Sequence, residues 1–136
     1  MALKIGMHKS SIYIVSKDTV QAGMLTYLLK SDNFHPVILH PSASECFYSM
    51  EKGRIPSFII FDQKEQRIGF VDFIRSVHSF SREISVICLL DHDDEPIARG
   101  ILDSGACDII LRTGKHQHWM KELIANLAFL QKENWI

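Results

Sequence analysis

The chain has 136 residues, a length typical of one domain. Hydrophobic residues make up 46% of it and charged residues 23%, which is enough for a packed core under an ordinary surface. The formal net charge of -1 excludes a strongly basic surface for nucleic acid or anionic membranes. No apolar run approaches the roughly 20 residues that a membrane-spanning helix needs. We therefore expect one domain over 1–136 that binds neither membranes nor nucleic acid.

The N-terminus and the cysteines indicate the compartment. The first residues, "MALKIGMHKS", lack the continuous apolar segment of a secretory signal. The three cysteines, Cys46, Cys88 and Cys107, form no close-spaced pair of metal ligands and are odd in number. These features favour a reduced protein of the cytoplasm.

The first predicted strand covers residues 11–15, "SIYIV", and is continuously apolar rather than alternating. Such a run is typical of a strand that is buried on both faces of a sheet. Asp18 or Thr19 can cap the helix that follows. We expect that helix to pack through apolar residues that share one face, namely Val20, Met24, Tyr27 and Leu28.

The second strand is predicted at 34–40, "FHPVILH". Pro36 near its start favours an edge position, because proline cannot donate a hydrogen bond to a sheet ladder. Ser42 or Ser44 can cap the next helix, which Gly53 ends. The third strand, "SFIIFD", covers 57–62 and is nearly all apolar.

The second half of the chain repeats this alternation. A helix at 69–80 places Phe70, Phe73, Ile74 and Val77 on one face, and the most apolar strand follows at 83–91. A helix at 94–105 has Pro96 in its first turn, where a missing N–H costs little. A fifth strand at 107–112 precedes a last helix at about 115–131 with apolar residues at helical spacing, namely Met120, Leu123, Ile124 and Leu127. Strict alternation with buried strands predicts an α/β fold, a parallel sheet with helices on both faces.

Functional residues in such a sheet gather where the strands end, at their carboxyl edge. The third strand ends in Asp62, the one carboxylate in an otherwise apolar segment. A helix cap or a solvated loop acid is the simpler interpretation of an isolated aspartate. The surrounding sequence favours a functional role for Asp62.

Three segments resemble the receiver domain of bacterial response regulators, over roughly residues 11–131. They are "IYIVSKDTVQAGMLTYLLK", "PSFIIFD" and "DHDDEPIARGILDSGACDIILRTG". The resemblance implies a flavodoxin-like, doubly wound, five-stranded parallel sheet of order 2-1-3-4-5 with five helices in three α/β/α layers. It places the family's phosphoacceptor aspartate at Asp62.

The other active-site positions depart from the family pattern. Two adjacent acids normally follow the first strand, and here the residues are Ser16 and Lys17, with Asp18 next. A hydroxyl residue normally ends the fourth strand, and the match gives Leu90. The fifth strand carries Arg112 in place of a lysine and Ile109 in place of an aromatic residue.

These departures disfavour magnesium-dependent phosphorylation. Mg²⁺ prefers carboxylate oxygens in octahedral geometry, whereas Ser16 is a weak neutral ligand and Lys17 repels a cation. We hypothesise that Lys17 takes the place of the metal and pairs with Asp62, assisted by Arg112. An ordinary solvated Lys17 is the alternative. No metal and no cofactor are expected, and Mg²⁺ only if Asp62 is phosphorylated after all.

The sequence thus favours a non-enzymatic signalling module, an atypical receiver that acts by binding proteins. One alternative is a phosphoacceptor receiver that a histidine kinase phosphorylates on Asp62, and another is a flavodoxin-like domain that binds a small ligand. Expected partners are a histidine kinase, a downstream effector or a second copy of the chain. By resemblance, the fourth helix, fifth strand and fifth helix would form the binding face, with Arg99, Asp103, Lys115, His118, Trp119 and Glu122 as candidate members.

Overall fold

A computed structural model describes residues 11–133 of the chain. Within this range, strands and helices alternate in the predicted order, each strand somewhat shorter than the apolar run that predicts it. The elements are β1 (Ile12–Val15), α1 (Thr19–Ser31), β2 (Val37–His40), α2 (Ala43–Glu51), β3 (Phe58–Asp62), α3 (Phe70–Phe80), β4 (Ser85–Leu90), α4 (Glu95–Asp103), β5 (Asp108–Leu111) and α5 (His116–Glu133).

The strands form one parallel sheet of order β2-β1-β3-β4-β5, as predicted. β2 lies at an edge of the sheet, which agrees with the position of Pro36 just before it. The central strands are buried along their whole length, because helices cover both sides of the sheet. This explains why their sequences are continuously apolar rather than alternating.

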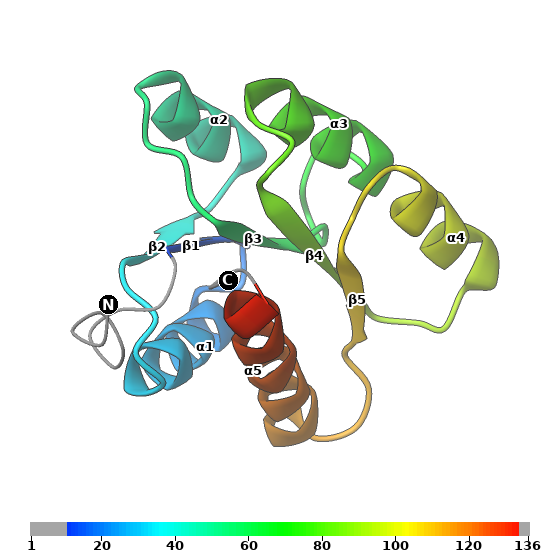
Figure 1. The fold of residues 1–136 in the computed structure, drawn as a ribbon. Helices are drawn as coiled ribbons and strands as arrows, with labels where there is room; N and C mark the ends of the chain where they lie inside the picture. Colours follow the sequence, from blue (N-terminus) through cyan, green and yellow to red (C-terminus); the bar gives the residue numbers. More distant parts are fainter. Residues whose placement is uncertain (1–10, 134–136) are drawn as a thin grey trace.

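The helices divide the molecule into three layers. Figure 1 shows α1 and α5 on one face of the sheet and α2, α3 and α4 on the other. Two separate apolar clusters fill the two interfaces. Phe61 and Phe73 stack at 3.8 Å between ring centroids in the cluster beneath α3, while Trp119 and Met120 belong to the cluster beneath α5.

Short polar side chains fix where the helices begin. Asp18, Ser42 and Asp94 each accept a hydrogen bond from the backbone N–H three residues ahead, which satisfies one of the unpaired donors of a first turn. Asp94 is the last acid of the run "DHDD", and its role is therefore to cap α4. Gly105 follows α4 with φ +108°, a conformation that side chains rarely adopt.

The packed face of α1 differs from the predicted one. Ala22, Leu25 and Leu29 are buried against the sheet. Both sets of positions are spaced by three and four residues, so helical periodicity fits either of them. The small side chain of Ala22 gives a weak apolar signal in the sequence, so the face that is buried was not recognised. Most of the predicted face is exposed to solvent: Val20 by 75%, Met24 by 44% and Tyr27 by 71%.

None of the helices within residues 11–133 is long and apolar enough to cross a membrane.

Candidate functional site

The polar residues that end the strands meet at one edge of the sheet. Ser16 directly follows β1, Asp62 ends β3, Asp91 follows β4 and Arg112 follows β5. Because all strands run in parallel, their carboxyl ends share this edge. The structure therefore brings side chains together that are up to 96 positions apart in the sequence.

Both carboxylate oxygens of Asp62 are engaged. Ser16 Oγ donates to Oδ2 at 2.8 Å, while Arg112 Nη2 and the Lys64 backbone N–H donate to Oδ1 at 2.8 and 3.2 Å. Asp62 is 1% exposed and Ser16 3%. A buried carboxylate needs such donors, because an isolated buried charge is strongly destabilising.

Arg112 is the central group of the site. Its Nε and Nη2 donate to the two oxygens of Asp91 at 2.8 and 3.1 Å, which is the bidentate geometry of a guanidinium fork. Its Nη1 donates to Gln21 Oε1 at 2.7 Å. Burial opposes its charge, but the hydrogen bonds and charges of Asp62 and Asp91 outweigh burial and raise the pKa of Arg112. The guanidinium thus joins β3, β4, β5 and α1.

Lys17 does not take the position that we hypothesised. Its side chain is exposed, and among the described residues the ion pair of Asp62 is formed with Arg112 instead. Lys17 lines a separate cavity of about 380 Å³ next to the start of α2, with Ser42 and Glu65. Asp18 is not turned toward Asp62 either, because its carboxylate caps α1. The geometric reason is that the side chain of Ser16, directly after β1, is buried, so that the next residue, Lys17, faces solvent.

Leu90 and Ile109 replace the remaining family groups with hydrocarbon. Leu90 is 7% exposed at the end of β4, and its backbone carbonyl accepts a 2.7 Å hydrogen bond from the Arg112 N–H. Its side chain helps to line a cavity of about 260 Å³ beside the site, together with Phe70, Ile97 and Arg112. Ile109 is half-buried opposite Cys88 in the sheet.

Only some of the residues predicted for the protein-binding face are exposed to solvent. Trp119, a predicted member, is 2% exposed and belongs to the core beneath α5, so it lies outside any such face. Its position beside the apolar stripe of α5 turns it inward, where its Nε1–H donates to His116. Arg99 pairs with Glu95 along α4. The remaining predicted members are exposed: Asp103, Lys115, His118 and Glu122.

Sequence reasoning missed two partners of Arg112. No role was predicted for Asp91, although the pairing of Leu90 with Leu111 places the next residues of both strands side by side. That register could have been inferred from a parallel β4–β5 pair. Gln21 gave no such signal, because its contact depends on how α1 lies across the edge of the sheet.

Comparison with solved structures gives the same architecture. The signal receiver domain of a putative LuxO repressor protein from Vibrio parahaemolyticus matches with a TM-score of 0.75 and 17% identity, covering 93% of this chain and 95% of that one. A putative response regulator from Chloroflexus aurantiacus matches at 0.72 and 20%, covering 88% and 98%. This chain has the receiver-domain fold. A response regulator from Thermotoga maritima shares that receiver fold at 0.73 and 17%, covering 88% and 98%.

At these identities the likeness concerns the fold alone. No protein-family model matches the chain, and no curated protein does. The residues at the edge of the sheet must therefore carry any argument about what this receiver fold does.

Proposed function

We propose that this chain is an atypical signalling receiver that acts by binding other proteins rather than by catalysis or reversible phosphorylation. The observation that carries the proposal is the ion pair between Asp62 and Arg112, at 2.8 Å with side chains 2% and 7% exposed. The pair occupies the place where a phosphoryl group and its metal would have to assemble.

The donors around Asp62 do not fit a magnesium ion. Mg²⁺ is held by carboxylates and waters in octahedral geometry. Here the Ser16 hydroxyl donates toward Asp62, and the guanidinium of Arg112 lies against both Asp62 and Asp91. Within residues 11–133, no group of three or more His, Cys, Asp or Glu residues is arranged to hold a metal. A permanent cation thus stands where a divalent ion would be needed.

The same contacts disfavour attack by Asp62 on a phosphoryl donor. A nucleophilic carboxylate oxygen must reach the phosphorus in line, and the developing charge must be neutralised. Oδ1 carries two hydrogen bonds and Oδ2 one, and the residue is 1% exposed. Leu90 supplies no hydroxyl for a phosphoryl group once it is formed.

The exposed side of α4 and the start of α5 is the proposed contact surface for a protein partner. Ile97 and Leu102 on α4 are 45% and 51% exposed, which adds apolar area to the charged residues predicted there. Asp103, Lys115 and Glu122, which are predicted members of this surface, are exposed and carry charges of both signs. A histidine kinase, a downstream effector or a second copy of the chain are the partners that we propose for it.

The three cysteines are free thiols. Burial raises the pKa of Cys46 and that of Cys88 to about 12, so both thiols stay protonated and inert. This chemistry suits a reducing compartment, and we place the protein in the cytoplasm as part of the proposal.

The test is phosphorylation by a small acyl phosphate. We expect the intact mass to stay unchanged after incubation with acetyl phosphate and Mg²⁺. A matched variant, with Ser16→Asp, Lys17→Asp and Arg112→Lys together, restores the usual charges and should gain one phosphoryl group. A phosphoryl group on the natural protein that is lost in Asp62→Ala would instead establish the phosphoacceptor alternative.

A further inference from the structure

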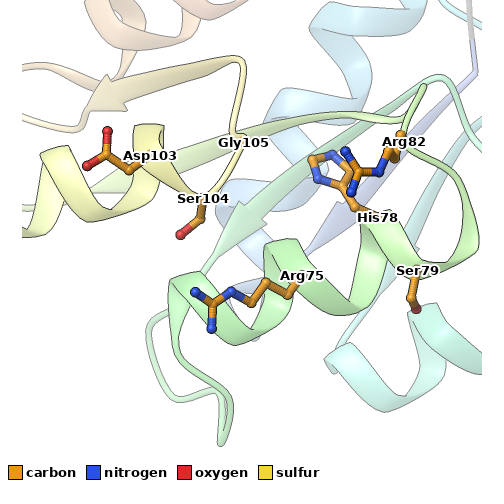
Figure 2. A pocket seen from close by; sticks show the side chains of 7 residues that line it. All are labelled: Arg75, His78, Ser79, Arg82, Asp103, Ser104 and Gly105. Atoms are coloured by element: carbon orange, nitrogen blue, oxygen red, sulfur yellow. The ribbon is translucent and has the colours of Figure 1, made fainter.

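A further cavity lies at the opposite end of the strands from Asp62. It has a volume of about 490 Å³ and opens between the ends of α3 and α4, next to the turns that lead into β4 and β5. Figure 2 shows Arg75, His78 and Ser79 on α3, Arg82 in the turn after it, and the end of α4 facing them. Its volume lies in the range of small-molecule sites, about 300–1,000 Å³.

The lining of this cavity is basic. Arg75 and His78 are three residues apart on one side of α3, and Arg82 lies in the turn that follows the helix. Neither guanidinium forms an ion pair or a side-chain hydrogen bond with another residue of the described range 11–133. Asp103 is the one acid in the lining. Two guanidiniums are thus free to bind an oxyanion, for which their planar fork is suited.

The other polar groups of the lining are acceptors. Ser79 and Ser104 donate their hydroxyl protons to backbone carbonyls of Ser76 and Gly100, so their oxygens remain free to accept. His78 Nε2 lies 3.1 Å from the Ile84 carbonyl, which can only accept, and therefore carries the ring proton. In the neutral ring Nδ1 is then an acceptor as well.

Gly105 keeps the space beside this ring open. A Cβ at Gly105 would lie 3.0 Å from His78 Cε1 and 3.2 Å from Nδ1. Real Cβ atoms rarely come so close, so a side chain there would displace the imidazole. Glycine at position 105 thus lets the imidazole keep its place in the lining of the cavity.

We propose that this cavity binds a small phosphorylated polyol, such as a sugar phosphate. The guanidiniums of Arg75 and Arg82 hold the phosphate, and hydroxyl groups of the ligand donate to Asp103, Ser104 and His78. In Figure 2 the guanidinium of Arg82 lies beside the His78 ring, whereas that of Arg75 points away from it. Both side chains are exposed, so Arg75 can turn inward when the ligand binds.

The probe for this site is glucose-6-phosphate, titrated into isotope-labelled protein and followed by two-dimensional NMR. We expect saturable shifts of the amide signals of residues 78–82 and 103–105. Arg82→Gln should weaken binding by about tenfold, because a charge-assisted contact is lost. Arg54→Gln is the matched control, since the contact of Arg54 is made by its backbone carbonyl, and it should leave the affinity unchanged.

Two comparisons separate the parts of the proposal. Glucose should cause no shifts, and inorganic phosphate should bind more weakly than the sugar phosphate. Equal binding by natural protein and by the Arg75→Gln, Arg82→Gln double variant would overturn the site. Equal affinity for inorganic phosphate would overturn the polyol, and the lack of any saturable shift up to about 10 mM would overturn both. None of these results depends on whether Asp62 accepts phosphate.

Discussion

At the scale of single residues, the buried arginine is expected to have a large effect on stability. Arg112→Ala would leave Asp62 buried with a charge that only Ser16 and the Lys64 N–H still stabilise. Removing one partner of a buried ion pair typically costs about 3–5 kcal/mol. We expect the free energy of unfolding in urea to fall by about 3 kcal/mol in this variant.

Arg112→Lys is the informative control for this loss. A lysine keeps the positive charge but cannot contact Asp62, Asp91 and Gln21 together. It should therefore be less damaging than alanine. A loss below about 1 kcal/mol in Arg112→Ala would mean that the pair contributes like an exposed one.

His40 gives the fold a dependence on pH. Burial lowers the pKa of His40, which a nearby Glu45 partly offsets, and its buried Nε2 has no hydrogen-bond partner among residues 11–133. A proton therefore binds more readily to the unfolded chain than to the folded one. The contribution of His40 to stability is complete above the unfolded pKa of about 6.5 and is lost as the pH falls below it.

The measurement is unfolding in urea at pH 7.5 and at pH 5.5, which lie about one unit above and below the unfolded pKa of histidine. The natural protein should lose more stability between these conditions than His40→Phe, which keeps a ring against Tyr13. An identical loss in both proteins would show that His40 is not the cause of the acid sensitivity.

At the scale of elements, α1 shows that the residues packed against the sheet differ from those that the apolar pattern of the sequence predicts. Leu25 is 1% exposed and Met24 is 44% exposed, although they are adjacent and both apolar. Leu25→Ala should cost about 2–5 kcal/mol, because it leaves a cavity beneath the helix. Met24→Ala should cost about 0.5 kcal/mol or less. Urea unfolding of the two variants tests this, and similar losses would mean that α1 packs as the sequence pattern predicted.

The elements were largely predictable from the sequence, whereas their contacts were not. Apolar runs that end at Ser, Asp or Gly located every strand and helix, because burial on both faces removes polar residues from the strands. Asp62 was recognised as the carboxylate that ends β3. Arg112 was expected only to assist Lys17, and its role as the ion-pair partner was not predicted, because the choice between the two depends on which way a strand end turns.

At the scale of the whole molecule, the two faces of the sheet are separate layers, and the candidate sites lie at its two ends. Asp62 and Arg112 lie at the carboxyl ends of the strands, and the basic cavity lies where β4 and β5 begin. A ligand in the basic cavity would therefore not touch Asp62 or Arg112, whereas Asp103 belongs both to this cavity and to the proposed contact surface. The sequence does not point to the basic cavity, because Arg75, Arg82 and Asp103 resemble ordinary surface residues.

The guanidinium of Arg112 also has a consequence for the order in which the chain folds. Its contacts reach back 21, 50 and 91 positions, to Asp91, Asp62 and Gln21. Contacts of such long range can form only after most of the loop-closure entropy has been lost. The pair is therefore expected to form after the main folding barrier, so that it acts on the rate of unfolding rather than on that of folding. One side chain would thus lengthen the lifetime of the folded molecule without hastening its formation.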